Sequence, residues 1–239
     1  MKKTLYRSKD RGYANHGWLE AKHSFSFASW FNPEKMNFGV LRVLNDDRVA
    51  PGAGFPTHPH DNMEIITIPL SGVLEHKDSM GNTAQIRTGE VQVMSAGTGV
   101  THSEYNASDS EDLRLFQIWI FPNKRGVEPR YDQQFIAKDL SNGWQQIISP
   151  DKSASNMWIH QDAWLSMGQV DLGKSLTYKR KGKETGLYLM VIEGEVNMVD
   201  ENLKKRDAIG IDSAEEITIQ AAINSKLLLI EVPMQLPQY

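Results

Sequence analysis

Two pairs of residues in the sequence have the types and the spacing that metal sites use. His58 and His60 are separated by one residue, and so are His102 and Glu104. Residues i and i+2 of an extended chain project to the same face, so each pair can present two ligands in one direction. Three imidazoles and one carboxylate form a mixed nitrogen and oxygen set, which suits iron, nickel, copper, manganese or zinc. The sequence therefore predicts a metal site at these four residues, against the alternative of polar turns that carry surface histidines.

The segments around the two pairs have the pattern of short strands. Residues 63–70 and 113–121 are apolar and rich in β-branched side chains, and residues 91–94 form a shorter segment of the same kind. Glycine, proline and asparagine interrupt the chain between such segments, and no long stretch of the sequence has a helical period. Short strands with frequent turn signals predict an all-β barrel or sandwich. The paired ligands would then lie on strands and point into one interior.

The second half of the chain repeats the pattern of the first. The composition loosens after Pro122, which places a domain boundary near residue 130 and divides the chain into residues 1–130 and 131–239. Residues 193–196 resemble residues 70–73, which indicates an internal duplication.

The duplication predicts a chemical difference between the two halves. Aligning Gly72 with Gly194 places Arg180 opposite His58 and Gly182 opposite His60. The second half of the sequence contains no His-x-His pair. We therefore expect one metal ion, bound in the first domain, and a second domain that lacks metal ligands.

The composition argues against several classes of protein. Of the 239 residues, 40% are hydrophobic and 23% are charged, which is typical of a folded chain. The net charge of −4 without a basic stripe argues against nucleic acid as a partner. The sequence has no cysteine, which excludes disulfides and thiolate ligands. No apolar run approaches the roughly 18–20 residues of a membrane helix, and the first residues lack the apolar stretch of a signal peptide. A cytoplasmic monomer without a membrane partner is expected.

The spacing around the first histidine pair resembles a known motif. The segment from Gly52 to Gly72 resembles the first motif of the cupin superfamily, with a last gap that is one residue longer than usual. Residues 89–106 approximate the second cupin motif, with Ser95 where proline is usual and a longer gap before His102.

Four stretches of the sequence are similar to one branch of this superfamily, the pirins. These stretches are residues 11–18, 23–28, 57–64 and 94–104. The resemblance is to bacterial pirin-like proteins assigned as quercetin 2,3-dioxygenases. It is dense from Arg11 to about Arg130 and rests afterwards on the layout of a bicupin. It implies an all-β fold of two antiparallel β-barrel or jelly-roll domains.

The resemblance also implies roles for individual residues. In pirins the two histidines of His-x-His, the later histidine and the glutamate two residues beyond it bind the metal. These positions are filled here by His58, His60, His102 and Glu104. In many other cupins the position of Glu64 supplies the carboxylate ligand, so Glu64 is interpreted as a candidate partner of a metal-bound imidazole. The implied cofactor is one divalent transition metal ion, with iron expected and nickel, copper, manganese, cobalt or zinc as alternatives.

The implied reaction is the cleavage of a flavonol such as quercetin by O2, with release of carbon monoxide. Glu104 is the expected base for the flavonol 3-hydroxyl. Two alternatives are a metal-containing, redox-sensing regulatory protein that binds a protein partner, and another small-molecule cupin enzyme. A third is a closed, four-coordinate metal site with a structural role only.

Other histidines and aromatic residues have two interpretations each. His76 follows a strand and either faces the cavity or is a surface or hydrogen-bonded structural residue. Five aromatic side chains either line a pocket or fill the core, as large aromatic residues commonly do: Phe25, Phe27, Trp30, Phe31 and Phe38.

Overall fold

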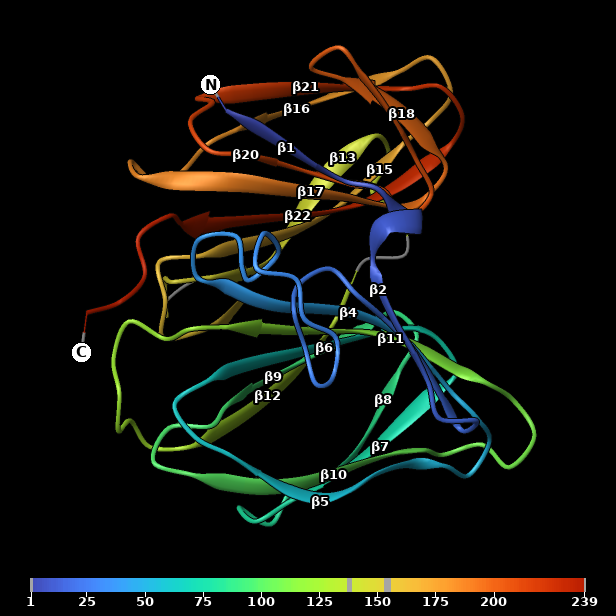
Figure 1. The fold of residues 1–239 in the computed structure, drawn as a ribbon, viewed down its shortest axis with the longest axis vertical. Helices are drawn as coiled ribbons and strands as arrows, with labels where there is room; N and C mark the ends of the chain where they lie inside the picture. The colour runs from blue at the N-terminus through green and yellow to red at the C-terminus, as the bar shows by residue number, and fades with distance from the viewer. Residues whose placement is uncertain (1, 137–138, 153–155, 239) are drawn as a thin grey trace.

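The computed structural model describes residues 2–136, 139–152 and 156–238. Two β-domains are stacked on one another, and each consists of a large sheet and a small sheet (Figure 1). Strand pairs are antiparallel, except that β13 and β14 pair in parallel. One 3-10 helix, η1 (Ser8–Asp10), is the helical element of the described residues. The predicted all-β bicupin is therefore confirmed. Within the described part of the chain, no helix has the length and apolar character needed to cross a membrane.

The N-terminal domain contains the two predicted ligand pairs. Its seven-stranded sheet has the order β12 (Arg130–Phe135), β9 (Glu90–Ser95), β6 (Glu64–Ser71), β11 (Leu113–Ile120), β4 (Leu41–Val49), β3 (Leu19–His23) and β2 (Gly12–Asn15). Its four-stranded sheet has the order β5 (Gly54–His60), β10 (Val100–Asn106), β7 (Val73–Asp78) and β8 (Thr83–Arg87). Both ligand pairs lie on the four-stranded sheet, on the neighbouring strands β5 and β10.

The C-terminal domain has the same arrangement. Its seven-stranded sheet has the order β1 (Lys3–Tyr6), β20 (Ala208–Ile211), β17 (Thr185–Glu193), β22 (Ser225–Pro233), β15 (Trp164–Val170), β13 (Gly143–Ser149) and β14 (Met157–Trp158). Its four-stranded sheet has the order β16 (Ser175–Lys179), β21 (Glu216–Ala221), β18 (Glu195–Met198) and β19 (Glu201–Lys204).

The ends of the two domains are interlaced. Strand β1 begins at residue 3 but pairs with β20, so the start of the chain forms the edge of the C-terminal sheet. Strand β12 begins at Arg130 and pairs with β9, so it extends the N-terminal sheet. The division into residues 1–130 and 131–239 stays a prediction. By strand pairing, β1 belongs to the C-terminal sheet and β12 belongs to the N-terminal sheet.

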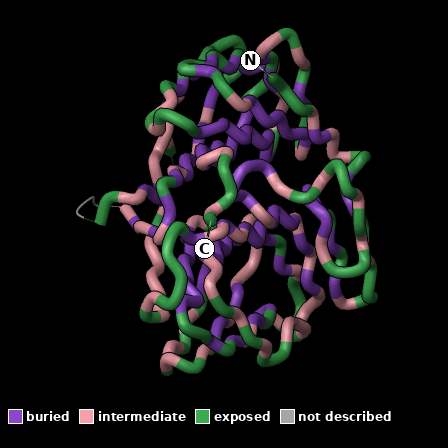
Figure 2. Tube along the Cα trace, turned by 60° about the vertical axis from the view of Figure 1, so that its left-hand side comes forward, coloured by how far each residue is buried: buried purple, intermediate pink, exposed green. Residues whose placement is uncertain are grey.

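The largest apolar core lies where the two seven-stranded sheets face each other. Ile66 and Phe116 of the N-terminal domain belong to the same buried cluster as Tyr188 and Leu228 of the C-terminal domain. Figure 2 shows buried residues running through both domains, with exposed residues gathered at the loops. Burying both faces of a sheet produces continuous apolar strands rather than alternating ones, and β6 has this character.

The two faces of β6 have different surroundings. Ile66 and Ile68 belong to the core between the domains. Ile65 points to the other side and packs with Met94 inside the N-terminal domain. Successive side chains of a strand alternate between the two faces, so even-numbered residues of β6 face the second domain and odd-numbered residues face the interior.

Candidate metal centre

Three histidines converge between the sheets of the N-terminal domain. His58 on β5 is the direct neighbour of His102 on β10, and their ring centroids are 4.5 Å apart. The ring of His60 is centred 4.8 Å from that of His58 and 4.9 Å from that of His102. Each ring offers one nitrogen, and these three atoms all lie within 4.8 Å of one another. Three ligand atoms at this spacing can contact one ion.

Two of the three histidines, His60 and His102, are held in the neutral form that metal binding requires. Burial, together with the neighbouring His58, lowers the pKa of His60 to about 4. Burial lowers the pKa of His102 to about 3, and the neighbouring rings of His58 and His60 add to this shift. Neutral imidazoles keep one ring nitrogen free as an acceptor. At neutral pH the rings of His60 and His102 therefore present lone pairs rather than positive charges.

The hydrogen bonds of the three histidines are also those expected of metal ligands. Both ring nitrogens of His102 are buried and have no hydrogen-bond partner within residues 2–136, 139–152 and 156–238. Buried polar atoms without a partner are costly and need an explanation. Nδ1 of His58 lies 2.8 Å from the carbonyl oxygen of Pro56. A bond of this kind on one ring nitrogen orients the other toward an ion. These residues fit a divalent metal ion.

Glu104 is buried beside His102. Its carboxyl group is fully buried and accepts hydrogen bonds from Nε2 of Gln117 at 2.7 Å and from Oγ1 of Thr67 at 3.3 Å. Burial raises the pKa of Glu104 to about 7, and these two hydrogen bonds oppose the shift. Its oxygen groups with nitrogens of His102 and His76, all within 4.8 Å. The structure thus brings His58, His60 and His102 together and joins Glu104 to them through His102.

Glu64 does not contact the candidate metal centre, so its interpretation as a partner of a metal-bound imidazole is wrong. Glu64 is an even-numbered residue of β6, and its Oε2 accepts a hydrogen bond of 2.7 Å from Oγ of Ser95. Its carboxyl group is on the side of Arg130 and His160. The physical reason lies at Asn62, whose φ of 45° interrupts the alternation between β5 and β6.

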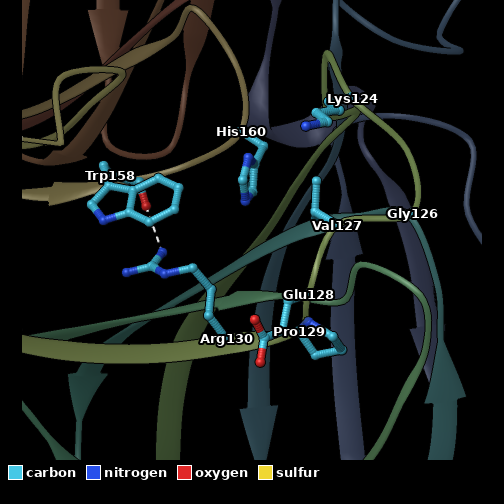
Figure 3. A pocket seen from close by; sticks show the side chains of 8 residues that line it. All are labelled: Lys124, Gly126, Val127, Glu128, Pro129, Arg130, Trp158 and His160. Carbon is cyan, nitrogen blue, oxygen red and sulfur yellow. Dashed lines mark hydrogen bonds between the residues drawn. The ribbon is translucent and has the colours of Figure 1, made fainter.

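A cavity of about 650 Å³ lies between the two domains. Figure 3 shows Arg130 reaching toward Trp158, with its Nη1 donating a 2.7 Å hydrogen bond to the Trp158 carbonyl oxygen. The guanidinium carbon is 4.0 Å from the centre of the Trp158 ring. The residues that line this cavity include none of the four predicted ligands. The contacts of Arg130 therefore connect the domains without adding to the candidate metal centre.

Glu64→Gln is expected to change the pH dependence of stability. Burial raises the pKa of Glu64 from 4.5 to about 7, so the folded state binds a proton more tightly than the unfolded state. The stability from this protonation is complete below pH 4.5 and is lost as the pH rises through 7. The free energy of unfolding of the metal-free wild type should therefore fall relative to the variant by up to about 3 kcal/mol. Urea unfolding of both proteins from pH 4 to 8 measures the difference, and a constant difference would contradict this prediction.

A cavity of about 690 Å³ opens onto the histidines of the N-terminal domain. Trp119 contacts both His60 and Phe27 edge to face, with ring centroids 4.9 Å and 5.3 Å apart. Phe55 and Trp18 form another edge-to-face pair at 5.2 Å. His58, His60 and Glu104 also line the cavity, so apolar aromatic walls meet polar groups there. This combination suits a flat, partly polar small molecule.

The predicted aromatic residues have different surroundings. Phe27 lines the cavity, whereas Phe25 and Phe38 are buried in the core between the domains. Phe31 is exposed. The sequence interpretation missed Trp119 and Phe55, although Phe55 lies in the same strand as the first histidine pair.

The position of His76 beside the candidate metal centre was not predicted from the sequence. It is fully buried, and its Nε2 lies 3.0 Å from Oδ2 of Asp78. The interpretation as a hydrogen-bonded residue is confirmed, while its position next to His102 and Glu104 was not expected. Its spacing of two residues before Asp78 is the one signal that could have drawn attention to it.

Two stacked cupin-like domains, with a histidine cluster between the sheets of the first, define a bicupin with a candidate metal centre. The family model for pirin matches residues 6–120, and the model for the quercetinase C-terminal cupin domain matches residues 146–232. A protein of Escherichia coli strain K12 named quercetin 2,3-dioxygenase is 42% identical over 229 residues, which cover 96% of this chain and 98% of that protein. The chain belongs to the pirin family.

Other relatives agree with this assignment. A pirin-like protein of Caulobacter vibrioides is 42% identical over 222 residues, or 92% of this chain and 95% of the relative. The crystal structure of the bacterial pirin YhhW from E. coli in complex with nickel(II) is 40% identical. It superposes with a TM-score of 0.92 and covers 99% of this chain and 100% of its own. The sequence resemblance to pirins is confirmed.

Proposed function

We propose that this pirin is a metal-dependent dioxygenase that cleaves a flavonol such as quercetin with O2 and releases carbon monoxide. The observation that carries the proposal is the cavity of about 690 Å³, where aromatic walls meet His58, His60 and Glu104. A flavonol is flat, aromatic and rich in hydroxyl groups, so both kinds of lining have a use. The name of the E. coli relative supports the same reaction.

His58, His60, His102 and Glu104 are the residues proposed to hold one divalent ion. When bound, the ion supplies the positive charge that favours a deprotonated hydroxyl on the substrate and a point against which O2 is oriented. Iron is the ion expected from the sequence, and nickel(II) is the ion in YhhW. A nitrogen and oxygen ligand set accepts either of them, so availability decides between the two.

Glu104 is proposed to be the catalytic base. A general base works best when its pKa lies near the operating pH, and burial raises the pKa of Glu104 to about 7. Gln117 and Thr67 hold the carboxyl group in place through hydrogen bonds. Oε1 of Gln117 in turn accepts a 2.9 Å hydrogen bond from Nε1 of Trp119 on the cavity wall. The base and the aromatic wall are therefore positioned by one chain of hydrogen bonds.

The test is a comparison of the metal-loaded protein with the same concentration of free metal salt. Nickel(II) and iron(II) are each loaded into metal-free protein, and O2 uptake and carbon monoxide release are followed with quercetin and with other flavonols. We expect turnover that requires both protein and metal. Equal rates with protein and with free salt would overturn the proposal and leave the metal centre to a sensing or binding role.

A further inference from the structure

His76 lies next to the candidate metal centre but lines a different part of the domain interior. It projects from β7, the neighbour of β10 on the side opposite to β5. Its ring is centred 5.3 Å from that of His102 and 5.0 Å from that of Tyr131. It is fully buried and is absent from the residues that line the substrate-sized cavity.

One nitrogen of His76 is fixed by a carboxylate that is itself held rigidly. Oδ1 of Asp78 accepts hydrogen bonds from the backbone N–H groups of Met80 and Asn82, each at 3.0 Å. Oδ2 of Asp78 accepts one of 2.8 Å from Nδ2 of Asn82 and lies 3.0 Å from Nε2 of His76. A carboxylate can only accept, so Nε2 of His76 donates to it. The lone pair of the neutral ring is consequently on Nδ1.

The other nitrogen of His76 is buried without a hydrogen-bond partner among the residues that the structure describes. His76, His102 and Glu104 each offer a ligand atom, and these three atoms lie within 4.8 Å of one another. A histidine that donates one nitrogen to a carboxylate and directs the other at further ligand atoms is the usual arrangement around metal ions. The free Nδ1 therefore has the lone pair that a ligand needs.

We propose a second ion position, deeper in the N-terminal domain, formed by His76, His102 and Glu104. This inner position rests on the proposed metal centre, because it shares His102 and Glu104 with the four ligands proposed there. The group of His58, His60 and His102 is the outer cluster. A neutral imidazole has one acceptor nitrogen, so His102 binds an ion at one position at a time. The two positions are alternatives for a single divalent transition metal ion with nitrogen and oxygen preference.

The two positions differ in their access to substrate. His58 and His60 line the cavity of about 690 Å³, whereas His76 and His102 do not. An ion at the outer position meets the cavity through two of its histidines, whereas an ion at the inner position meets it through Glu104 alone. The inner position therefore keeps the ion bound with less access to the cavity than the outer position gives.

Cobalt(II) alone, titrated into metal-free protein, tests the inference without any measurement of activity. Isothermal titration calorimetry gives the number of ions and their affinity, and the visible absorption of cobalt reports the ligand geometry. We expect one ion in the wild type. The double variant His58→Ala/His60→Ala should still bind one ion, more weakly and with a different absorption spectrum. Adding His76→Gln to this double variant should abolish the remaining binding.

A milder variant guards against a loss of fold. Asp78→Asn in the His58→Ala/His60→Ala background keeps every inner ligand but removes the carboxylate that orients His76. Its cobalt affinity should fall by about 10- to 100-fold, the usual effect of losing such a partner. Far-ultraviolet circular dichroism of each metal-free variant confirms that the strands are intact.

The outcomes separate the inner position from the metal centre as a whole. If the double variant binds no more cobalt than the triple variant, or if Asp78→Asn leaves its affinity unchanged, the inner position is overturned and the outer cluster stands. If the wild type binds no cobalt, or binds it no better than the triple variant, the metal centre itself is overturned.

Discussion

His102→Ala is expected to remove metal binding from the N-terminal domain almost completely. His102 is the one residue shared by the outer cluster with His58 and His60 and by the inner grouping with His76 and Glu104. Every other single change leaves at least one of these groupings intact. Its loss should therefore abolish flavonol turnover and lower metal affinity more than His58→Ala does.

The fold should survive this change. Neither ring nitrogen of His102 makes a hydrogen bond within the described residues, and the apolar clusters of the domain do not include this ring. Each protein is dialysed against a metal salt, and elemental analysis then measures its metal content. His160→Ala, at the domain interface, is the matched control. Metal content in His102→Ala equal to that of the wild type would show that the ligand assignment is wrong.

Glu104→Gln is expected to separate metal binding from turnover. Glutamine keeps an oxygen that accepts from Gln117 and an amide that donates to the hydroxyl of Thr67, so both existing contacts can be preserved. It loses the negative charge and the basicity. Because general-base catalysis contributes on the order of 100-fold or more, turnover of quercetin should fall at least about 100-fold while some metal remains bound.

The chain offers a close control for this variant. Glu64 is also a buried glutamate whose pKa burial raises to about 7, but it faces the second domain rather than the cavity. Glu64→Gln should therefore keep both metal and turnover. Rates of O2 uptake and carbon monoxide release at equal metal occupancy compare the three proteins. Similar losses in both variants would point to a general effect of removing buried charge, and no loss in either would exclude Glu104 as the base.

Sequence reasoning succeeded where the physics is local. His58 and His60 project to the same face because both lie on the extended strand β5. The placement of Glu64 failed because it depends on the backbone between β5 and β6, where Asn62 has a φ of 45°. A side chain four positions beyond His60 would face the same way in a continuous strand, and this interruption directs it to the other domain.

Features that depend on strand register could not be obtained from the sequence pattern. His76 reaches Glu104 because β7 pairs with β10 in the register that sets these two residues opposite each other. Nothing within the segment 73–78 specifies that partner. The same limit applies to β1, whose partner β20 begins at Ala208.

The pairing of β1 with β20 has a consequence for the order in which the chain folds. Lys3 pairs with Ile211, so β1 is synthesised long before its partner and must wait for β20 to be made. Contacts between residues so distant in sequence are slow to form. Until β1 arrives, β20 is an open edge strand, the kind of surface that pairs with other chains. The docking of this short strand therefore covers that edge of β20 in the C-terminal sheet.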